Sequence, residues 1–415
     1  MAEAPVRTAY LWTNILNAPF WALYGMLLFI LYKDLHASPL EISLFIALKP
    51  GVSLLSTYWS ALVHGRPDRL RMNVMAAGIL GHLPFFIVPF FASSVWLIAA
   101  GAFYMMLMRG IIPAWMEIIK LYIPKLKREK LFSLGSVISY VGAIVLPLLF
   151  GYLLDRDPLC WRFLFPLMAL LSLSGMFFQW RIPIPSEAKI TDSRRLKEAI
   201  AHPWKMSWQL LRAKPDFWRY QVGFMLLGGG GLMILQPALP LFFVDRLALS
   251  YTELAIALSV CKAIGFVATS RLWTKAMSRF SFYRLSSAVT FLAALFPLLL
   301  LLSEASLAWV YIAYLIYGVM QAGSELSWHF SGPHFSKEEE SSRYSTVNVL
   351  SVGVRGLITP FLGSLLCTHL GAKTTLLTGG FLCLAACLQL NLSERTRKNL
   401  SLIPEAFSSR SRKEE

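Results

Sequence analysis

Charged residues are scarce in this chain of 415 residues. Asp, Glu, Lys and Arg make up 15% of it, whereas soluble globular domains contain about a quarter. Hydrophobic residues account for 56%, and the mean hydropathy is +0.57. This balance excludes an ordinary soluble domain and predicts an all-α polytopic membrane protein.

The sequence also lacks the residue patterns of a metal centre, a disulfide framework or a catalytic site. The five cysteines do not have the spacing of metal ligands, and they are not the even number expected of a disulfide framework. They are Cys160, Cys261, Cys367, Cys383 and Cys387. The histidines His82, His329 and His334 have no metal-like spacing either. No nucleophile–base pair is visible. We therefore expect no cofactor, no metal and no enzymatic activity.

Long polar stretches are equally few. The N-terminus carries a single arginine, Arg7, and no small-residue cleavage site, so a removable signal peptide is not expected. A non-transporting receptor or scaffold would be expected to carry a sizeable extramembrane domain, and only a central linker and a short tail are polar. The net charge of +16 occurs as short clusters between apolar runs, which does not fit a nucleic-acid partner.

The apolar runs are long enough to cross about 30 Å of hydrocarbon at about 1.5 Å per residue. Twelve such segments are predicted, and only helices satisfy the backbone there. Their spans are 11–32, 40–63, 72–92, 95–121, 131–154, 160–180, 219–244, 252–273, 284–303, 306–329, 345–368 and 373–391.

Lysine and arginine are distributed unequally between the connections. One side of the predicted membrane holds 30 of them and the other side 5, while Lys49, Arg109, Lys262 and Arg355 lie within spans. Positive loops stay cytoplasmic, so both termini and the linker are predicted to be cytoplasmic. The expected location is a bacterial inner membrane, and the expected oligomeric state is a monomer.

The linker separates two halves. We predict an N-terminal six-helix domain over 1–180, a basic linker over 181–218, a C-terminal six-helix domain over 219–392 and a cytoplasmic tail over 393–415. Within the linker, five apolar residues recur at steps of three and four, as in a helix lying in the membrane interface; they are Leu196, Ile200, Trp204, Trp208 and Leu211. A soluble connector helix is the alternative.

The two halves repeat one another at an offset of 212 to 213 residues. Capping boxes of the form Ser-x-x-Glu begin at Ser38 and Ser250, and each is followed by an intramembrane lysine, Lys49 or Lys262. A Gly-Pro-Gly pattern in 142–151 parallels one in 356–363. Repeats of equal orientation are related by an axis along the membrane normal.

This organisation resembles the major facilitator superfamily over residues 1 to 392. The resemblance implies two six-helix domains that rock about a central cavity lined by helices one, four, seven and ten. The family's loop after helix two survives only in part, as Gly65, Arg66, Asp68, Arg69 and Arg71. Leu146 stands where the antiporter signature has glycine, a departure from that signature that argues against a simple drug/proton antiporter.

Polar and aromatic side chains follow single faces of the expected cavity helices. The predicted substrate-binding residues are Asn14, Asn17, Trp21, Tyr24, Arg109, Gln236, Tyr314, Tyr317 and Gln321. Helix seven combines Gly228 to Gly231 with Pro237 and Pro240, which predicts a bent or discontinuous helix. Helix–helix packing is the alternative explanation for each face.

Intramembrane charges are expensive unless they are paired or hydrated. Glu325, Arg355, Lys262 and Lys49 are the predicted coupling residues, with Glu325 and Arg355 expected to form a pair. The excess of cations favours an anionic or zwitterionic metabolite, moved with proton coupling or by exchange. A facilitator or efflux transporter of a neutral or cationic compound is the alternative. The predicted partners are a small-molecule substrate, the lipid bilayer and the proton.

Overall fold

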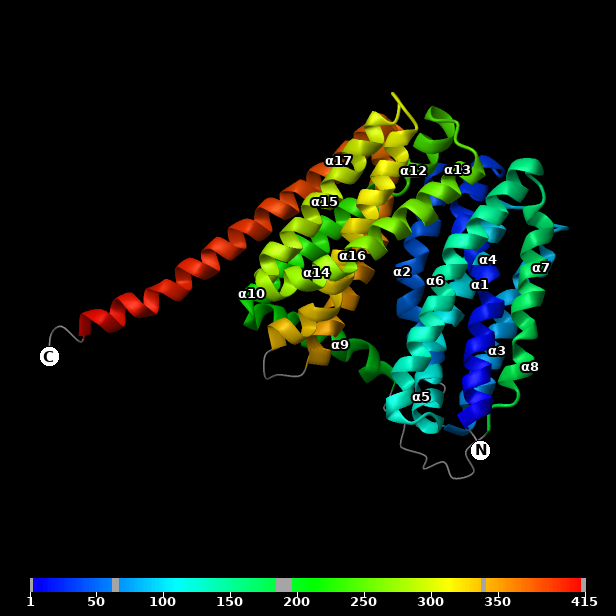
Figure 1. Cartoon of the computed structure of the whole chain (residues 1–415), viewed down its shortest axis with the longest axis horizontal. Helices are drawn as coiled ribbons and strands as arrows, with labels where there is room; N and C mark the ends of the chain where they lie inside the picture. The colour runs from blue at the N-terminus through cyan, green and yellow to red at the C-terminus, as the bar shows by residue number, and fades with distance from the viewer. Residues whose placement is uncertain (1–2, 62–66, 184–195, 337–340, 412–415) are drawn as a thin grey trace. The chain divides into compact units, whose positions relative to one another are not determined.

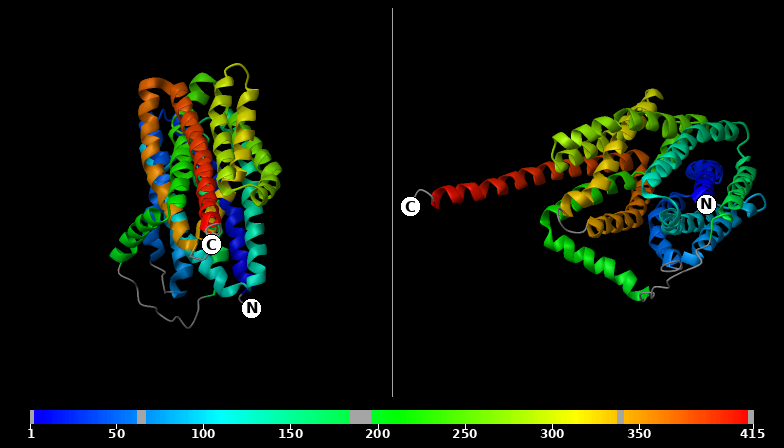
Figure 2. Two further views of the ribbon diagram at one scale, coloured as in Figure 1. Left: turned by 90° about the vertical axis from the view of Figure 1, so that its left-hand side faces the viewer. Right: turned by 60° about the horizontal axis from the view of Figure 1, so that its bottom comes forward.

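The computed structural model describes residues 3–61, 67–183, 196–336 and 341–411. Every regular element in these ranges is helical, and the helices of each unit run side by side (Figures 1 and 2). The chain forms two compact units, residues 1–194 with 239–260, and residues 195–238 with 261–415. The predicted domains differ from these units at residues 239–260, which pack with the N-terminal helices.

The first unit contains the N-terminal helices and a short segment of the second half of the chain. Its α-helices are α1 (Glu3–Lys33), α2 (Pro39–Ala61), α3 (Leu70–His82), α4 (Ser94–Gly110), α5 (Ile112–Tyr122), α6 (Lys125–Arg156), α7 (Trp161–Ser174), α8 (Met176–Gln179), α12 (Ala238–Leu241, starting one residue earlier) and α13 (Tyr251–Ala255). Short 3-10 turns η1 (Pro67–Arg69) and η2 (Leu83–Ile87) flank α3, and π-helical turns η4 (Phe242–Arg246) and η5 (Ile256–Cys261) flank α13.

The second unit begins with the linker helix. It contains α9 (Leu196–Ala213), α10 (Pro215–Tyr220), the π-helix η3 (Gln221–Gly228), α11 (Gly229–Ile234), α14 (Lys262–Arg279), α15 (Phe282–Leu302), α16 (Ala308–Ser336) and α17 (Ser341–Ser411). Gly371, with φ of 84°, interrupts the helical backbone inside α17. That break lies between the predicted spans 345–368 and 373–391. Glycine suits this position because it adopts a positive φ without the steric cost of a Cβ.

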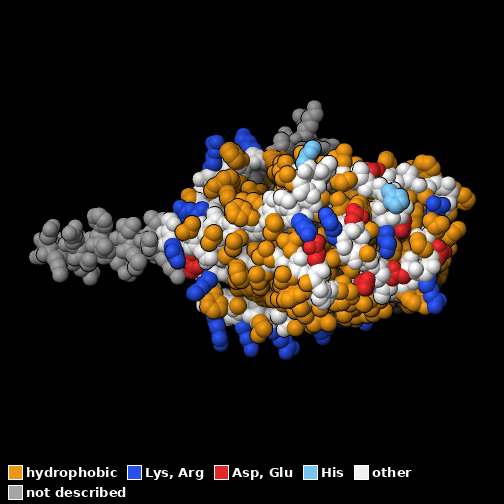
Figure 3. Space-filling view, turned by 90° about the horizontal axis from the view of Figure 1, so that it is seen from above, with side chains coloured by type: hydrophobic (Ala, Val, Ile, Leu, Met, Phe, Trp, Pro, Cys, Tyr) orange, Lys and Arg blue, Asp and Glu red, His pale blue; other side chains and the backbone are white. Residues whose placement is uncertain are grey.

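Nine helices in the described ranges are long and apolar enough to cross a membrane. They include the segment Arg343–Thr396, which holds two predicted spans. The two remaining predictions, 40–63 and 306–329, are occupied by α2 and α16. Large hydrophobic side chains are widely exposed, and they cover much of the surface in Figure 3. The all-helical membrane fold predicted from the sequence is confirmed.

The predicted discontinuity of helix seven is also confirmed. Between Pro215 and Arg246 the chain passes from α10 into the π-helix η3, then into α11, and leaves helical geometry at residues 235–237 before α12. Pro237 lacks the N–H that a continuous helix would use. The span therefore consists of short segments whose backbone carbonyls are available to side chains.

The linker contains helix α9, in which the side chains of Leu196 and Ile200 from the predicted interfacial face lie outside the described residues, and the interfacial position of this face stays a prediction. Leu210 is buried and Leu211 packs against the core of the second unit, whereas Trp204 and Trp208 are exposed. The Arg212 guanidinium lies 4.8 Å from the ring centre of Trp208. The first part of the predicted linker, residues 184–195, lies outside the described residues. Aromatic rings beside cations are typical of a membrane–water interface.

Candidate functional site

Three of the predicted substrate residues on α1 lie together in the first unit. The Trp21 and Tyr24 rings are 5.7 Å apart, and each lies within 5.7 Å of the Tyr104 ring on α4. The Tyr104 hydroxyl donates a hydrogen bond of 3.1 Å to Asn17 Oδ1, which also accepts one of 2.8 Å from Ser172. We call Asn17, Trp21, Tyr24 and Tyr104 the aromatic cluster. Trp21 is exposed, whereas Tyr24 is buried.

A cation stands beside this cluster. Lys49 on α2 is exposed, and its ammonium lies 5.5 Å from the ring centre of Tyr24 and 5.3 Å from that of Phe45. Arg109 is exposed in the last turn of α4. Asn14 donates to the Tyr10 carbonyl one turn earlier in its own helix. The structure thus brings Lys49 to the cluster and gives Asn14 a local hydrogen bond.

The predicted residues of the second unit form a separate group. The rings of Tyr314 and Tyr317 on α16 are 6.1 Å apart, and both contact Phe296 on α15. Gln321 is half-buried one turn further along α16. Gln236 is half-buried in the turn between α11 and α12, and Lys262 is half-buried at the start of α14. Tyr314 is buried, so packing accounts for much of its surroundings.

Arg355 approaches the backbone of the discontinuous helix. Its Nη1 donates a hydrogen bond to the Met225 carbonyl in η3, and its Nε is buried. A Cβ added at Gly229 would lie 1.6 Å from Arg355 Nη1. The guanidinium therefore occupies space that exists because residue 229 is glycine.

The predicted pair of Glu325 with Arg355 is not formed in this structure. Glu325 instead lies 3.4 Å from His329 Nε2 on the same helix, with side-chain exposures of 47% and 68% for the acid and the histidine. The reason is geometric, because α16 continues to Ser336 and presents Glu325 on an exposed face, while Arg355 is held by η3. The predicted coupling roles of both residues stay untested.

A buried polar network links η3 with α16 and α17, and none of its members is among the substrate-binding residues predicted from the sequence. Gln221 donates a hydrogen bond of 2.6 Å to Asn348 Oδ1 and accepts one of 2.8 Å from the Ser351 hydroxyl. Asn348 in turn donates a hydrogen bond of 2.6 Å to the Ser331 hydroxyl. Gln221 lies in the predicted span 219–244, and Asn348 follows a serine-rich stretch with no regular polar face. Buried amides with all partners satisfied fix the register of packed helices.

A second cluster joins the two halves of the sequence within the first unit. Asp155, at the end of α6, accepts hydrogen bonds from the backbone amides of Tyr251 and Thr252 at 2.7 and 2.8 Å and from the Thr252 hydroxyl at 2.6 Å. The predicted capping box of Ser250 and Glu253 is confirmed at the same helix start. Asp155 thus adds a carboxylate to the positive end of α13.

Asp34, just after α1, extends this cluster. It accepts a hydrogen bond of 2.8 Å from the Tyr251 hydroxyl, and the Lys33 ammonium lies 4.5 Å from the Tyr251 ring centre. Burial raises the pKa of Asp34, partly opposed by the Tyr251 hydrogen bond and by Lys33 and His36. We call Asp34, Asp155, Tyr251 and Thr252 the clasp.

The clasp was not predicted from the sequence, because its partners are separated by 96 to 217 residues. The capping box marked the start of a helix but not the acid that contacts it. Within the described ranges, no group of three His, Cys, Asp or Glu side chains could hold a metal ion.

The chain matches one family profile by sequence and many solved structures by fold. No curated protein sequence matches the chain. A POT family transporter in complex with 5-aminolevulinic acid has a TM-score of 0.75 at 13% identity, over 93% of this chain and 95% of that one. The nucleoside transporter NupG has a TM-score of 0.73 at 11% identity, over 94% and 98%.

A bacterial homologue of the human lysosomal transporter Spinster, in an inward-facing and unoccupied conformation, has a TM-score of 0.60 at 17% identity, over 94% of this chain and 95% of that one. At these identities the likeness concerns the fold. The sequence profile described as Major Facilitator Superfamily matches residues 11–332. The chain therefore belongs to the Major Facilitator Superfamily, a family of membrane transporters and not of enzymes.

Proposed function

We propose that this secondary transporter moves a small anionic or zwitterionic solute by alternating access. The observation that carries the proposal is the exposed Lys49 ammonium beside the aromatic cluster on α1 and α4. An ammonium attracts a carboxylate or phosphate, while aromatic rings and the Asn17 amide accommodate the remaining apolar and polar parts of a solute. Arg109, which lies on α4, is a second exposed cation in the same unit.

The clasp supports the alternating-access part of the proposal. Asp155 belongs to the first half of the repeat, and Tyr251 and Thr252 belong to the second. Rocking of one half against the other separates these residues. Three hydrogen bonds to one carboxylate form and break without covalent chemistry, which suits a contact that is made once in each transport cycle.

Proton coupling is assigned to Glu325 and His329. Both side chains are exposed and 3.4 Å apart, and a carboxylate and an imidazole at this distance can share a proton. A proton shared by the two groups in one conformation and released in the other would couple the gradient to transport. Exchange without a proton is the alternative for this step.

A neutral or cationic substrate remains the second candidate. The matched structures include both a complex with 5-aminolevulinic acid, which carries an amino and a carboxyl group, and a nucleoside transporter. The fold therefore accommodates both classes of solute. The cation beside the aromatic cluster favours the first class for this chain.

The test is uptake by purified protein in proteoliposomes. A panel of labelled amino acids, organic acids, nucleosides and organic cations is offered with and without an inward proton gradient. We expect uptake of an anionic or zwitterionic member, stimulated by the gradient. Uptake of neutral or cationic compounds alone would support the second candidate.

Lys49 is then tested with the transported compound. Lys49→Gln should raise KM about tenfold, the effect of about 1.4 kcal/mol in binding, and Lys49→Arg should retain most of the affinity. Arg246→Gln removes another exposed charge, which lies outside the aromatic cluster, and serves as the control. Unchanged KM in Lys49→Gln would remove the anion-binding role.

A further inference from the structure

A pocket of about 500 Å³ opens at the surface of the second unit between α15 and α17. It is lined by Arg284, Leu388, Asn391, Leu392, Glu394 and Arg395. Neither its position nor its residues belong to the aromatic cluster or the clasp. It combines two guanidinium groups with exposed leucines.

The two arginines are available to an anion. Arg284 and Arg395 are exposed, and within the described part of the chain neither guanidinium has a carboxylate partner in an ion pair. The Arg284 guanidinium lies 5.5 Å from the ring centre of Phe280. Glu394 also lines the pocket, so the formal charge of the pocket's lining residues is +1 in total. Positive charge is therefore in excess at the pocket mouth.

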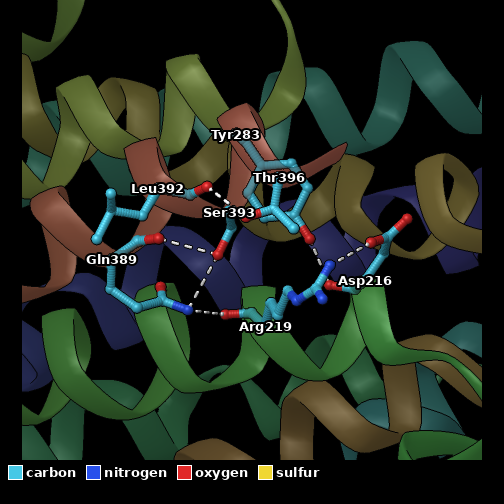
Figure 4. Close-up of polar contacts among 7 residues, drawn as sticks. All are labelled: Asp216, Arg219, Tyr283, Gln389, Leu392, Ser393 and Thr396. Carbon is cyan, nitrogen blue, oxygen red and sulfur yellow. Dashed lines mark hydrogen bonds and ion pairs between the residues drawn. The ribbon is translucent and has the colours of Figure 1, made fainter. Parts of the chain in front are cut away.

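The helices that form the pocket are fixed relative to one another. Asn391 donates a hydrogen bond of 2.7 Å to the Ser287 hydroxyl, and Ser287 donates one of 3.2 Å to the Cys387 carbonyl. A neighbouring network ties both helices to the start of helix seven (Figure 4). There the Tyr283 hydroxyl donates a hydrogen bond to the Asp216 carbonyl, and the Gln389 amide donates one of 3.1 Å to the Arg219 carbonyl. The pocket is thus preformed.

An exposed apolar stripe runs along α17 away from the arginines. Its members recur at steps of three, four and four, so they share one helical face; they are Phe381, Leu384, Leu388 and Leu392, with exposures of 70%, 40%, 58% and 60%. Eleven residues of helix cover about 16 Å. That length matches one leaflet of hydrocarbon, about 15 Å.

We propose that this pocket binds the headgroup of an anionic phospholipid. The phosphate lies between Arg284 and Arg395, the Asn391 amide contacts the glycerol region, and an acyl chain follows the stripe. The predicted topology puts the pocket on the cytoplasmic side, where anionic headgroups meet basic pockets between helices. A free phosphate would use the arginines but not the leucines, so the stripe favours a lipid.

The test is native mass spectrometry of the full chain in detergent, titrated with phosphatidylglycerol or with phosphatidylcholine of the same acyl chains. We expect preferential retention of phosphatidylglycerol. Arg284→Gln combined with Arg395→Gln should weaken its binding about thirtyfold, since each cation contributes about 1 kcal/mol. The double variant Lys275→Gln with Arg279→Gln removes two exposed charges outside the pocket and should bind as the wild type does.

Three results would overturn the proposal. They are equal retention of the two lipids, an equal loss in the control variant, and displacement of phosphatidylglycerol by millimolar inorganic phosphate. The last result would identify a site for a soluble anion. All variants change exposed side chains, and unchanged thermal unfolding checks that they fold.

Discussion

Arg355 and Gly229 show how a single residue fixes the position of a half-buried cation. A Cβ at position 229 would overlap the guanidinium, whereas one at the adjacent Gly230 would meet only the Thr359 methyl at 3.4 Å. Gly229→Ala should therefore move Arg355 away from the Met225 carbonyl. Leaving the Met225 carbonyl without this hydrogen bond costs about 1 to 3 kcal/mol.

The measurement compares thermal unfolding and transport of Gly229→Ala with those of Gly230→Ala. We expect a lower Tm and slower transport in the first variant and near-wild-type values in the second. Equal behaviour of the two variants would contradict the assigned position of Arg355.

Asp34 gives a pH dependence whose sign follows from its surroundings. Its pKa is raised in the folded protein, mainly by burial, so the folded state holds the proton more tightly than the unfolded state does. The stability contribution is present below the ordinary carboxyl pKa and is lost as pH rises through the raised value. Lys33, His36 and Tyr251 face this carboxylate and oppose or modulate the shift.

Asp34→Asn removes the titrating group and keeps an oxygen that accepts from Tyr251. The Tm of the Asn variant minus that of the wild type should increase as pH rises through this range, and it should then level off. A difference that stays constant or shrinks with pH would show that Asp34 is not titrating in the folded protein as described.

At the scale of elements, helices of the second unit approach one another through glycine. A Cβ at Gly318 on α16 would lie 2.0 Å from the Lys262 carbonyl oxygen on α14, and one at Gly265 on α14 would lie 2.1 Å from the Leu315 carbonyl oxygen. Small residues at such crossings let backbones meet in the absence of a hydrophobic drive between membrane helices.

Gly318→Ala must push α14 and α16 apart, because the obstructing atom belongs to the backbone. A loss of about 1 to 3 kcal/mol is expected, seen as a lower Tm in detergent. Gly25→Ala on α1, where no atom lies within 4 Å of the added carbon, is the matched control. A wild-type Tm for Gly318→Ala would refute the close crossing.

Local sequence patterns predicted these elements well and their contacts poorly. Apolar runs, capping boxes at Ser38 and Ser250, and the glycine–proline content of helix seven each depend on nearby residues, and each is confirmed. The aromatic face of α1 was visible as a periodic pattern. Tyr104 and Asp155 were not, because their roles depend on partners 87 to 97 residues away.

The Glu325 prediction shows the same limit. Depth along two helices suggested that Arg355 could reach it, but depth does not specify which face each side chain occupies. The glycine at 229 and the carbonyl of Met225 decide the direction of Arg355, and neither can be inferred from charge alone.

At the scale of the whole molecule, the distribution of 30 cations on one side and 5 on the other predicts cytoplasmic termini. Ser278, in the last turn of α14 before α15, and Ser306, in the connection after α15, are both exposed. In a cysteine-free background, Ser306→Cys should react with an impermeant thiol reagent in intact cells, and Ser278→Cys should react only after the membrane is made permeable. The reverse pattern would invert the topology.

The clasp offers the most direct test of alternating access. Cysteines replace Asp155 and Thr252 in the cysteine-free background, and counterflow uptake of the substrate is measured in proteoliposomes before oxidation, after cross-linking and after reduction. We expect the cross-link to stop uptake and reduction to restore it, and we expect neither single cysteine variant to respond to the oxidant. Uptake by the cross-linked protein at the rate of the reduced protein would contradict a cycle in which the clasp must open.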